Sequence, residues 1–474
     1  MTKIVLFELN EVPFRVLDDF VKRRPQSAVA RLLPRSAQFR TQTQDRLLSP
    51  WVTWPSLHRG AYDVDHGIQH FGQDLTAIDR RLPPLWKTLR ARGAQTGVFA
   101  SLHSYPPPAD AADYAFYVPD PFAAGSACYP PRLRSFQELN LRMSRQSARN
   151  VSTGVPWGAA ARFAVDSPRL GLRAATVAAT VRQLVDERRR PWTRVRRRTF
   201  QTVLAFDLFE KLLRSTQPDF CTFFTNHVAS SMHRYWAATY PADYEKMDFD
   251  AAWRAQFQDE IDYAMRWFDV MIARLEKFVH RHPEYEIWVA SSMGQAATSA
   301  QPCETQLYIT DLGRFMQAFG IAPGEWSQRP AMAPEVSVFV NEDRAPALRG
   351  ALAVLQVAGR PLHYSERERG FFMISAGHEN LPAGVQTADV GGRAVPLGDL
   401  GLENVAIEDQ STSSAYHVPE GSLWVLRAGA AQPGGRPVVG TTDLAPAILR
   451  RLGATPAATA TGDAAAVELL AARP

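Results

Sequence analysis

The 474-residue sequence has little cysteine, no long hydrophobic run and no strong excess of charge of one sign. Its three cysteines, Cys128, Cys221 and Cys303, are far apart and follow neither a metal-binding nor a disulfide spacing, which favours a reducing compartment. The apolar run near the start is too short for a signal peptide or a membrane span. We therefore expect a cytoplasmic protein with no membrane-spanning segment.

The net charge of +5 is only mildly basic, and much of the excess lies in the middle of the chain. The densest positive run, Arg188 to Arg198, is either a solvated helix end or a rim that attracts an anionic ligand. Aromatic residues interleave with it only at Trp192, so nucleic acid is not the expected partner. As a rim, this run would attract an anionic small molecule, and the sequence leaves the oligomeric state open.

Short apolar runs alternate with helical patterns along much of the chain, which is typical of an α/β protein. The runs at 4–9, 96–100, 220–225 and 286–290 are expected to be buried strands, and polar residues follow several of them directly. In open α/β sheets, active sites lie at the carboxyl ends of the strands.

Pro-rich and basic segments interrupt this alternation and predict insertions. The predicted division is a core of residues 1–100, 200–295 and 371–453, a loop-rich and basic helical insertion at 101–199, a cap insertion at 296–370 and a tail at 454–474.

The segment from Ser49 to Gly60 places small hydroxyl residues beside prolines at the start of a helical pattern. A helix start presents free backbone N–H groups that stabilise an anion, so Thr53 is a candidate nucleophile. Taken alone, the segment is better explained by ordinary turn and cap chemistry.

Together, five segments resemble the alkaline phosphatase superfamily, in particular its type I phosphodiesterase and nucleotide pyrophosphatase-like phosphohydrolases. The resemblance implies a doubly wound, mostly parallel sheet with helices on both faces and two divalent metals at its carboxyl edge, activating a Thr or Ser nucleophile. The matching segments are Leu9–Pro13, Thr53–Pro55 with His66–Ile68, His233–Trp236, Ser291–Gly294, and His417–Gly421 with Thr442–Pro446.

Carried over by position, the resemblance puts Thr53 at the nucleophile and His233 and His417 at metal-binding histidines. The expected carboxylates are absent: Asn10 stands for the first-strand Asp, Ala229 for the Asp four residues before His233, and Ser292 and Met293 for an Asp-His pair. Neutral side chains cannot offset two dications.

We therefore expect no metal, or at most one divalent Zn or Mn ion. Replacement carboxylates are conceivable at Glu8, Glu11, Glu304 and Glu379. Strand alternation points Glu8 to the same face as Asn10, which makes Glu8 the strongest of the four.

The surviving polar groups predict a ligand pocket at the sheet edge. The catalytic candidates are Thr53, His233 and His417, and the substrate-binding candidates are Asn10, Asn226, His227 and Glu8. Each histidine also has a structural interpretation as a core or cap residue.

Three functions remain open. The first is a diverged hydrolase or transferase acting on a phosphate, sulfate or glycosyl substrate, with one metal or none. The second is a non-catalytic relative that binds an anionic ligand or a protein partner. The third is a conventional two-metal phosphodiesterase with displaced ligands. A fold alone does not choose among them.

Overall fold

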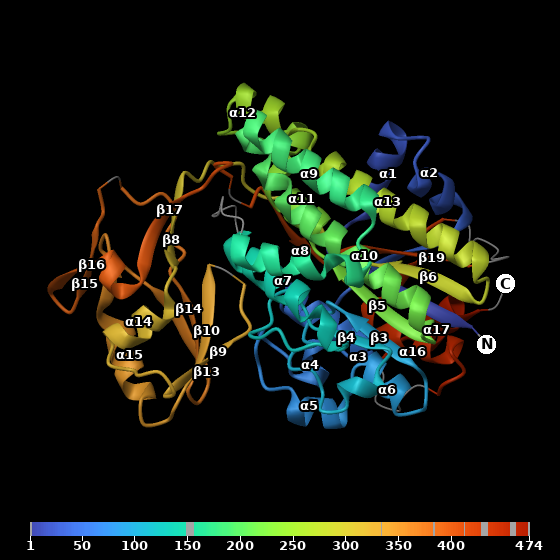
Figure 1. Cartoon of the computed structure of the whole chain (residues 1–474), viewed down its shortest axis with the longest axis horizontal. Helices are drawn as coiled ribbons and strands as arrows, with labels where there is room; N and C mark the ends of the chain where they lie inside the picture. The colour runs from blue at the N-terminus through green and yellow to red at the C-terminus, as the bar shows by residue number, and fades with distance from the viewer. Residues whose placement is uncertain are drawn as a thin grey trace.

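A computed structural model describes residues 2–147, 156–332, 334–382, 384–411, 413–427, 435–455 and 461–472. Its centre is an eight-stranded sheet with the order β20-β2-β19-β6-β1-β5-β3-β4 (Figure 1). Neighbouring strands are parallel except where β19 meets β2 and β6. The predicted doubly wound, mostly parallel sheet is confirmed. Its strands are β1 (Lys3–Leu9), β2 (Ala37–Gln42), β3 (Thr96–Phe99), β4 (Phe116–Val118), β5 (Phe220–Thr225), β6 (Tyr285–Ala290), β19 (Glu420–Leu426) and β20 (Val438–Gly440).

Strand β1 lies in the middle of the sheet because nearly all of its side chains are apolar. Its residues from Ile4 to Leu9 are buried on both faces, as is typical of a parallel strand covered by helices. It pairs with β5 on one side and with β6 on the other. The carboxyl ends of these three strands therefore lie side by side.

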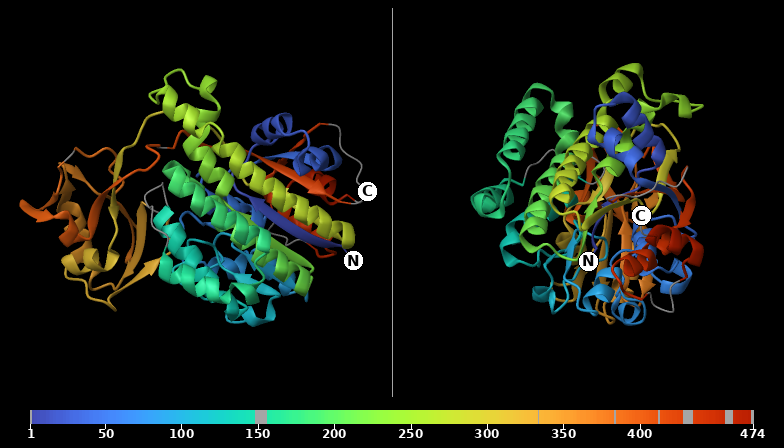
Figure 2. Two further views of the ribbon diagram at one scale, coloured as in Figure 1. Left: turned by 45° about the horizontal axis from the view of Figure 1, so that its top comes forward. Right: turned by 90° about the vertical axis from the view of Figure 1, so that its right-hand side faces the viewer.

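Helices cover both faces of the sheet (Figures 1 and 2). The long amphipathic helix α13 presents Ile261, Met265, Phe268 and Ile272 to the core. The helices of its layer are α1 (Phe14–Arg23), α2 (Ala28–Leu32), α10 (Arg197–Thr216), α11 (His227–Thr239), α12 (Ala251–Phe257) and α13 (Glu260–Arg281). Below the sheet in Figure 1 lie α3 (Pro50–Arg59), α4 (Asp63–His66), α5 (Thr76–Arg81), α6 (Leu85–Arg90) and α16 (Leu444–Arg451).

A smaller lobe, at the left in Figure 1, has a hydrophobic cluster of its own. Strand β14 (Phe371–Ser375), expected in the core, instead pairs with β10 and β13 of this lobe. A short apolar run looks the same in either sheet, so the sequence could not distinguish them. The other elements of the lobe are β8 (Thr305–Ile309), α14 (Leu312–Ala318), β9 (Trp326–Arg329), β10 (Glu335–Val340), α15 (Ala345–Val354), β11 (Leu355–Val357), β12 (Arg360–Pro361), β13 (His363–Glu368), β15 (Thr387–Val390), β16 (Arg393–Pro396) and β17 (Leu402–Ala406).

Helices fill much of the predicted insertion: α7 (Arg134–Ser147), α8 (Trp157–Leu170) and α9 (Ala174–Arg189). The same range also contributes β4, which forms one edge of the main sheet through its pairing with β3. In the predicted tail, α17 (Ala464–Ala471) packs on α16 and buries Val467 and Leu470. Among the described residues, no helix combines the length and the apolar character that crossing a membrane requires.

Candidate metal centre and its cavity

A cavity of about 240 Å³ lies at the carboxyl edge of the sheet, where the small lobe also contributes residues. Asn10 and Glu11 reach it directly after β1, and Asn226 and His227 reach it directly after β5. The structure thus brings five predicted site residues to one cavity: Asn10, Asn226, His227, His233 and His417.

Three side chains in this cavity form a cluster that can hold a metal ion. His233 comes from α11, His417 from β18 (Ala415–Val418), and Glu11 from the turn after β1. The Oε2 atom of Glu11 lies 2.9 Å from Nε2 of His233 and 3.4 Å from Nε2 of His417. All three potential ligand atoms lie within 4.8 Å of one another.

Backbone carbonyls fix the orientation of both imidazole rings. Nδ1 of His233 donates to the carbonyl of Ala415 at 2.7 Å, and Nδ1 of His417 donates to the carbonyl of Leu48 at 2.8 Å. A carbonyl only accepts, so Nδ1 carries a proton on each ring, and Nε2 faces Glu11. This is how metal-binding histidines are commonly held.

Glu11 is ionised in this environment. Burial alone would raise the pKa of Glu11, but the charges and hydrogen bonds of His417 and His233 hold it well below its usual range. Burial would lower the pKa of His417, and the Glu11 carboxylate raises it instead. The carboxylate also accepts hydrogen bonds from Nδ2 of Asn10, at 2.7 Å, and from Nε2 of Gln295.

The donor set can hold a divalent ion. Two imidazole nitrogens and a carboxylate oxygen suit Zn²⁺ and Mn²⁺. Gln295, on β7 (Gly294–Ala297), also has a buried Oε1 with no hydrogen-bond partner among the described residues. The Nε2 atom of the same amide donates to the Glu11 carboxylate, so Gln295 offers a further hard donor close to the cluster.

The remaining positions of the resemblance are occupied by neutral groups that bond to one another or pack. Oγ1 of Thr53 and Oγ of Ser292 share a hydrogen bond of 2.8 Å. Oδ1 of Asn10 accepts from Nε1 of Trp54 at 2.7 Å, and its Nδ2 also donates to Oδ1 of Asn226 at 2.7 Å. Met293 is buried and apolar. These groups offer no negative charge for a second dication.

Thr53 does not line the cavity. It lies in the first part of α3, has 0% of its surface exposed, and its hydroxyl is engaged by Ser292. The residues of this segment that reach the cavity are Ser49, Pro50 and Trp51.

Among the candidate replacement carboxylates, Glu11 joins the histidines and Glu8 does not. Glu8 is fully buried and bonds to Nε2 of His58 at 2.8 Å and to the hydroxyl of Ser101. Strand alternation favoured Glu8, but β1 ends at Leu9 and the backbone of Glu11 turns through a positive φ of 60°. Alternation no longer predicts side-chain direction after such a turn.

Glu379 also lines the cavity, whereas Glu304 is exposed.

His227 lines the cavity as a neutral group. Burial lowers its pKa to about 3. Its Nε2 donates to the carbonyl of Ala264 at 3.2 Å, and its Nδ1 accepts from Oγ1 of Thr225 at 2.5 Å. With both ring nitrogens engaged, His227 has no free lone pair for proton transfer.

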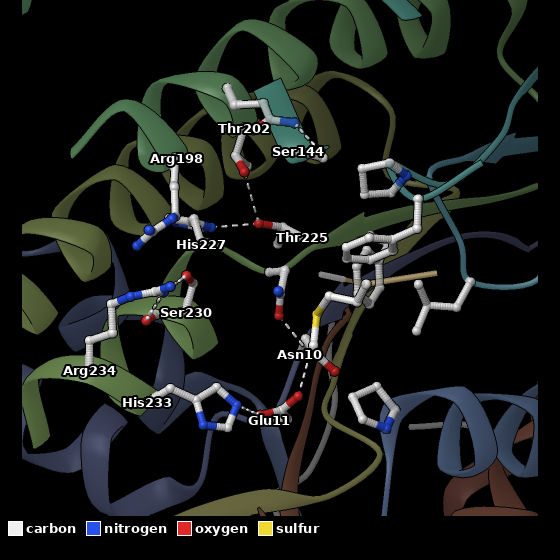
Figure 3. A pocket seen from close by; sticks show the side chains of 18 of the residues that line it. Asn10, Glu11, Ser144, Arg198, Thr202, Thr225, His227, Ser230, His233 and Arg234 are labelled. Atoms are coloured by element: carbon white, nitrogen blue, oxygen red, sulfur yellow. Dashed lines mark hydrogen bonds and ion pairs between the residues drawn. The ribbon is translucent and has the colours of Figure 1, made fainter. Parts of the chain in front are cut away.

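Two arginines that the sequence analysis did not single out face the cavity from α10 and α11. Figure 3 shows Arg198 and Arg234 on the same side of it. Arg234 donates to Oγ of Ser230 at 3.0 Å and lies 3.8 Å from Asp409. Burial, together with the charge of Arg234, lowers the pKa of Arg198 to about 9, which leaves it positive at neutral pH. The basic run from Arg188 to Arg198 indicated that arginines could bind an anionic ligand, but only the packing of the helices showed that Arg198 is the one that faces the cavity.

The sheet, its two helical layers and the His-Glu-His cluster at the carboxyl edge define a doubly wound α/β protein with a candidate metal centre. No protein-family model and no curated protein matches the sequence.

Among solved structures, the chain is similar to murine ectonucleotide pyrophosphatase/phosphodiesterase 5, with 11% identity, a TM-score of 0.43 and 99% of each chain covered. It is also similar to phosphonoacetate hydrolase from Sinorhizobium meliloti 1021 in complex with phosphonoformate, with 14% identity, a TM-score of 0.40 and 94% of each chain covered. Similarity at this level carries no argument about the chemistry of this chain.

Proposed function

We propose that this chain is a hydrolase of phosphate- or phosphonate-type substrates that uses one divalent ion, Zn²⁺ or Mn²⁺, held by Glu11, His233 and His417. The observation that carries the proposal is the convergence of both Nε2 atoms on one buried carboxylate, with each Nδ1 anchored to a backbone carbonyl.

A bound ion would supply Lewis acidity, which polarises a phosphoryl oxygen and stabilises the charge that develops there. Glu11 supplies the one negative charge of the cluster, and Asn10 and Gln295 hold its carboxylate by hydrogen bonds. Arg198 and Arg234 bind the anionic oxygens of the substrate from the other side of the cavity, in keeping with the preference of guanidinium for phosphate.

We propose water, rather than Thr53, as the attacking group. Thr53 is fully buried, bonded to Ser292 and outside the cavity lining, whereas water enters a cavity of about 240 Å³ without rearrangement. The oxygen of water bonds to phosphorus as the bond to the leaving group breaks, and the proton that water loses passes through solvent to the leaving group.

The test starts from metal-depleted full-length protein. Metal content after dialysis against Zn²⁺ or Mn²⁺ is measured, followed by hydrolysis of aryl phosphate monoesters, diesters and phosphonates. We expect one ion per chain and metal-dependent turnover that Glu11→Gln abolishes, while Glu304→Gln, a matched change at an exposed carboxylate, leaves it unchanged. Two ions per chain would instead support a two-metal phosphodiesterase, and turnover that survives metal removal would contradict the proposal.

A second candidate is a non-catalytic anion-binding protein. The observation that favours it is the hydrogen-bonded, neutral set of Asn10, Thr53 and Ser292 where the resemblance implies metal chemistry. This candidate predicts that phosphonoformate or phosphate binds in the cavity and that no ester on the panel turns over with any metal. Loss of that binding in Arg198→Gln would show that the anion binds in the cavity beside Arg198.

A further inference from the structure

Helix α9 packs against the protein with its polar side and leaves an apolar side in solvent. Its buried residues are Thr176, Gln183 and Glu187. Nε2 of Gln183 donates to the carbonyl of Thr193 at 2.8 Å, and Glu187 pairs with Arg197 at 2.6 Å. A surface helix ordinarily buries its apolar face, so α9 is inverted.

The exposed side of α9 is a continuous apolar stripe at helical spacing. Val177, Val181 and Val185 are 44%, 54% and 42% exposed, and they follow one another every four residues. Ala174 and Ala178 extend the same face. On the preceding helix, α8, Trp157 is 69% exposed and Val165 is 80% exposed. The right-hand view of Figure 2 shows these helices at the side of the molecule.

Arginines border this stripe. At 100° per residue, Arg182 and Arg189 fall along one edge of the valine face and Arg188 at its C-terminal end. All three are exposed, and none forms an ion pair with a described residue. The nearest acidic residues of the helix are engaged: Asp186 lies 3.6 Å from Arg190, and Glu187 is bound to Arg197.

We propose that this exposed face of α9 binds the surface of an anionic lipid bilayer. An apolar stripe edged by arginines matches a bilayer interface, where valines enter the acyl boundary and arginines reach the headgroups. A second copy of the chain is a poorer occupant, because two such faces would bring their unpaired arginines together. The surface is distinct from the metal centre, so it stands independently of the proposed hydrolase activity.

The experiment is co-sedimentation of the full-length chain with vesicles. Vesicles of phosphatidylcholine are compared with vesicles in which about a third of the lipid is phosphatidylglycerol, the anionic fraction being set high because each arginine near the surface contributes about 1 kcal/mol. We expect binding to the anionic vesicles only, weakened by salt.

Two variants test the two parts of the face. Val181→Glu is expected to weaken partition at least tenfold, whereas Val270→Glu, at a valine on α13 that is 43% exposed, leaves partition unchanged. Arg182→Gln combined with Arg189→Gln is expected to cost about fivefold per arginine. The matched control is Arg367→Gln with Arg393→Gln, at exposed arginines of the small lobe. Thermal unfolding shows that each variant folds.

Three results would overturn the proposal. The first is absence of binding to anionic vesicles. The second is binding that Val181→Glu leaves intact. The third is a concentration-dependent dimer that Val181→Glu dissociates, in the absence of vesicle binding, because the face would then be a contact between two copies of the chain.

Discussion

Replacing Glu11 with glutamine tests the metal centre most directly. The change keeps the shape of the side chain and removes the only negative charge in the cluster. The amide retains an oxygen that accepts from Asn10, and its NH₂ group takes the place of the Oε2 atom that faces both histidines and Nε2 of Gln295. Rotation of the Gln295 amide presents its Oε1, which has no partner among the described residues, to that NH₂ group. The metal-free protein therefore folds normally, and the loss falls on ion binding.

The magnitude follows from the burial of the carboxylate, whose residue is only 2% exposed. Removing one partner of a buried charge pair costs about 3–5 kcal/mol. We therefore expect the dissociation constant for Zn²⁺ to rise by about 100- to 5,000-fold. An exposed carboxylate has no comparable effect, so Glu304→Gln should change the constant by less than about twofold.

The assay is competition between metal-depleted protein and a chromogenic chelator of known affinity, with the ion titrated to saturation. Near-ultraviolet circular dichroism of each metal-free variant shows that its tertiary packing is intact. If Glu11→Gln bound Zn²⁺ within threefold of the unaltered protein, the three side chains would not be the ligands, and the single-metal hydrolase would have to be abandoned.

Three further outcomes are expected. In the metal-free protein, the raised pKa of His417 increases the free energy of unfolding below about pH 6.5, and this contribution is lost as the pH rises through the folded pKa. The lowered pKa of Glu11 also increases the free energy of unfolding, and that contribution is lost only in strong acid. Chemical unfolding should thus show a free energy of unfolding that falls from pH 6 toward pH 8, and the fall should be smaller in His417→Gln. The affinity for metal should rise over the same pH range. Thr53→Val should keep kcat within about twofold but lower the free energy of unfolding by about 1–2 kcal/mol, because Ser292 loses its partner; a kcat reduced a thousandfold would restore Thr53 as nucleophile. Arg198→Gln should raise KM for anionic substrates about tenfold or more with little change in kcat, and an unchanged KM would exclude Arg198 from substrate binding.

The local pattern of apolar residues was sufficient to predict the central strands of the main sheet. Continuous apolar runs predicted β1, β5 and β6, because a parallel strand buried on both faces needs apolar side chains at nearly every position. The same reasoning could not assign β14, whose five residues satisfy a small antiparallel sheet as well as a large parallel one. Which strand a run pairs with depends on residues far away in the chain.

By itself, the sequence determined that Asn10, Ala229, Ser292 and Met293 carry no carboxylate and that His233 and His417 offer imidazoles, since residue identity needs no coordinates. Only the tertiary structure decided that Glu11 lies against both histidines. The turn after β1 reverses the direction that strand alternation predicts and carries Glu11 toward two histidines more than 200 residues away in the chain. A charge can be read from a sequence, whereas the partner that stabilises it is set by how distant segments pack.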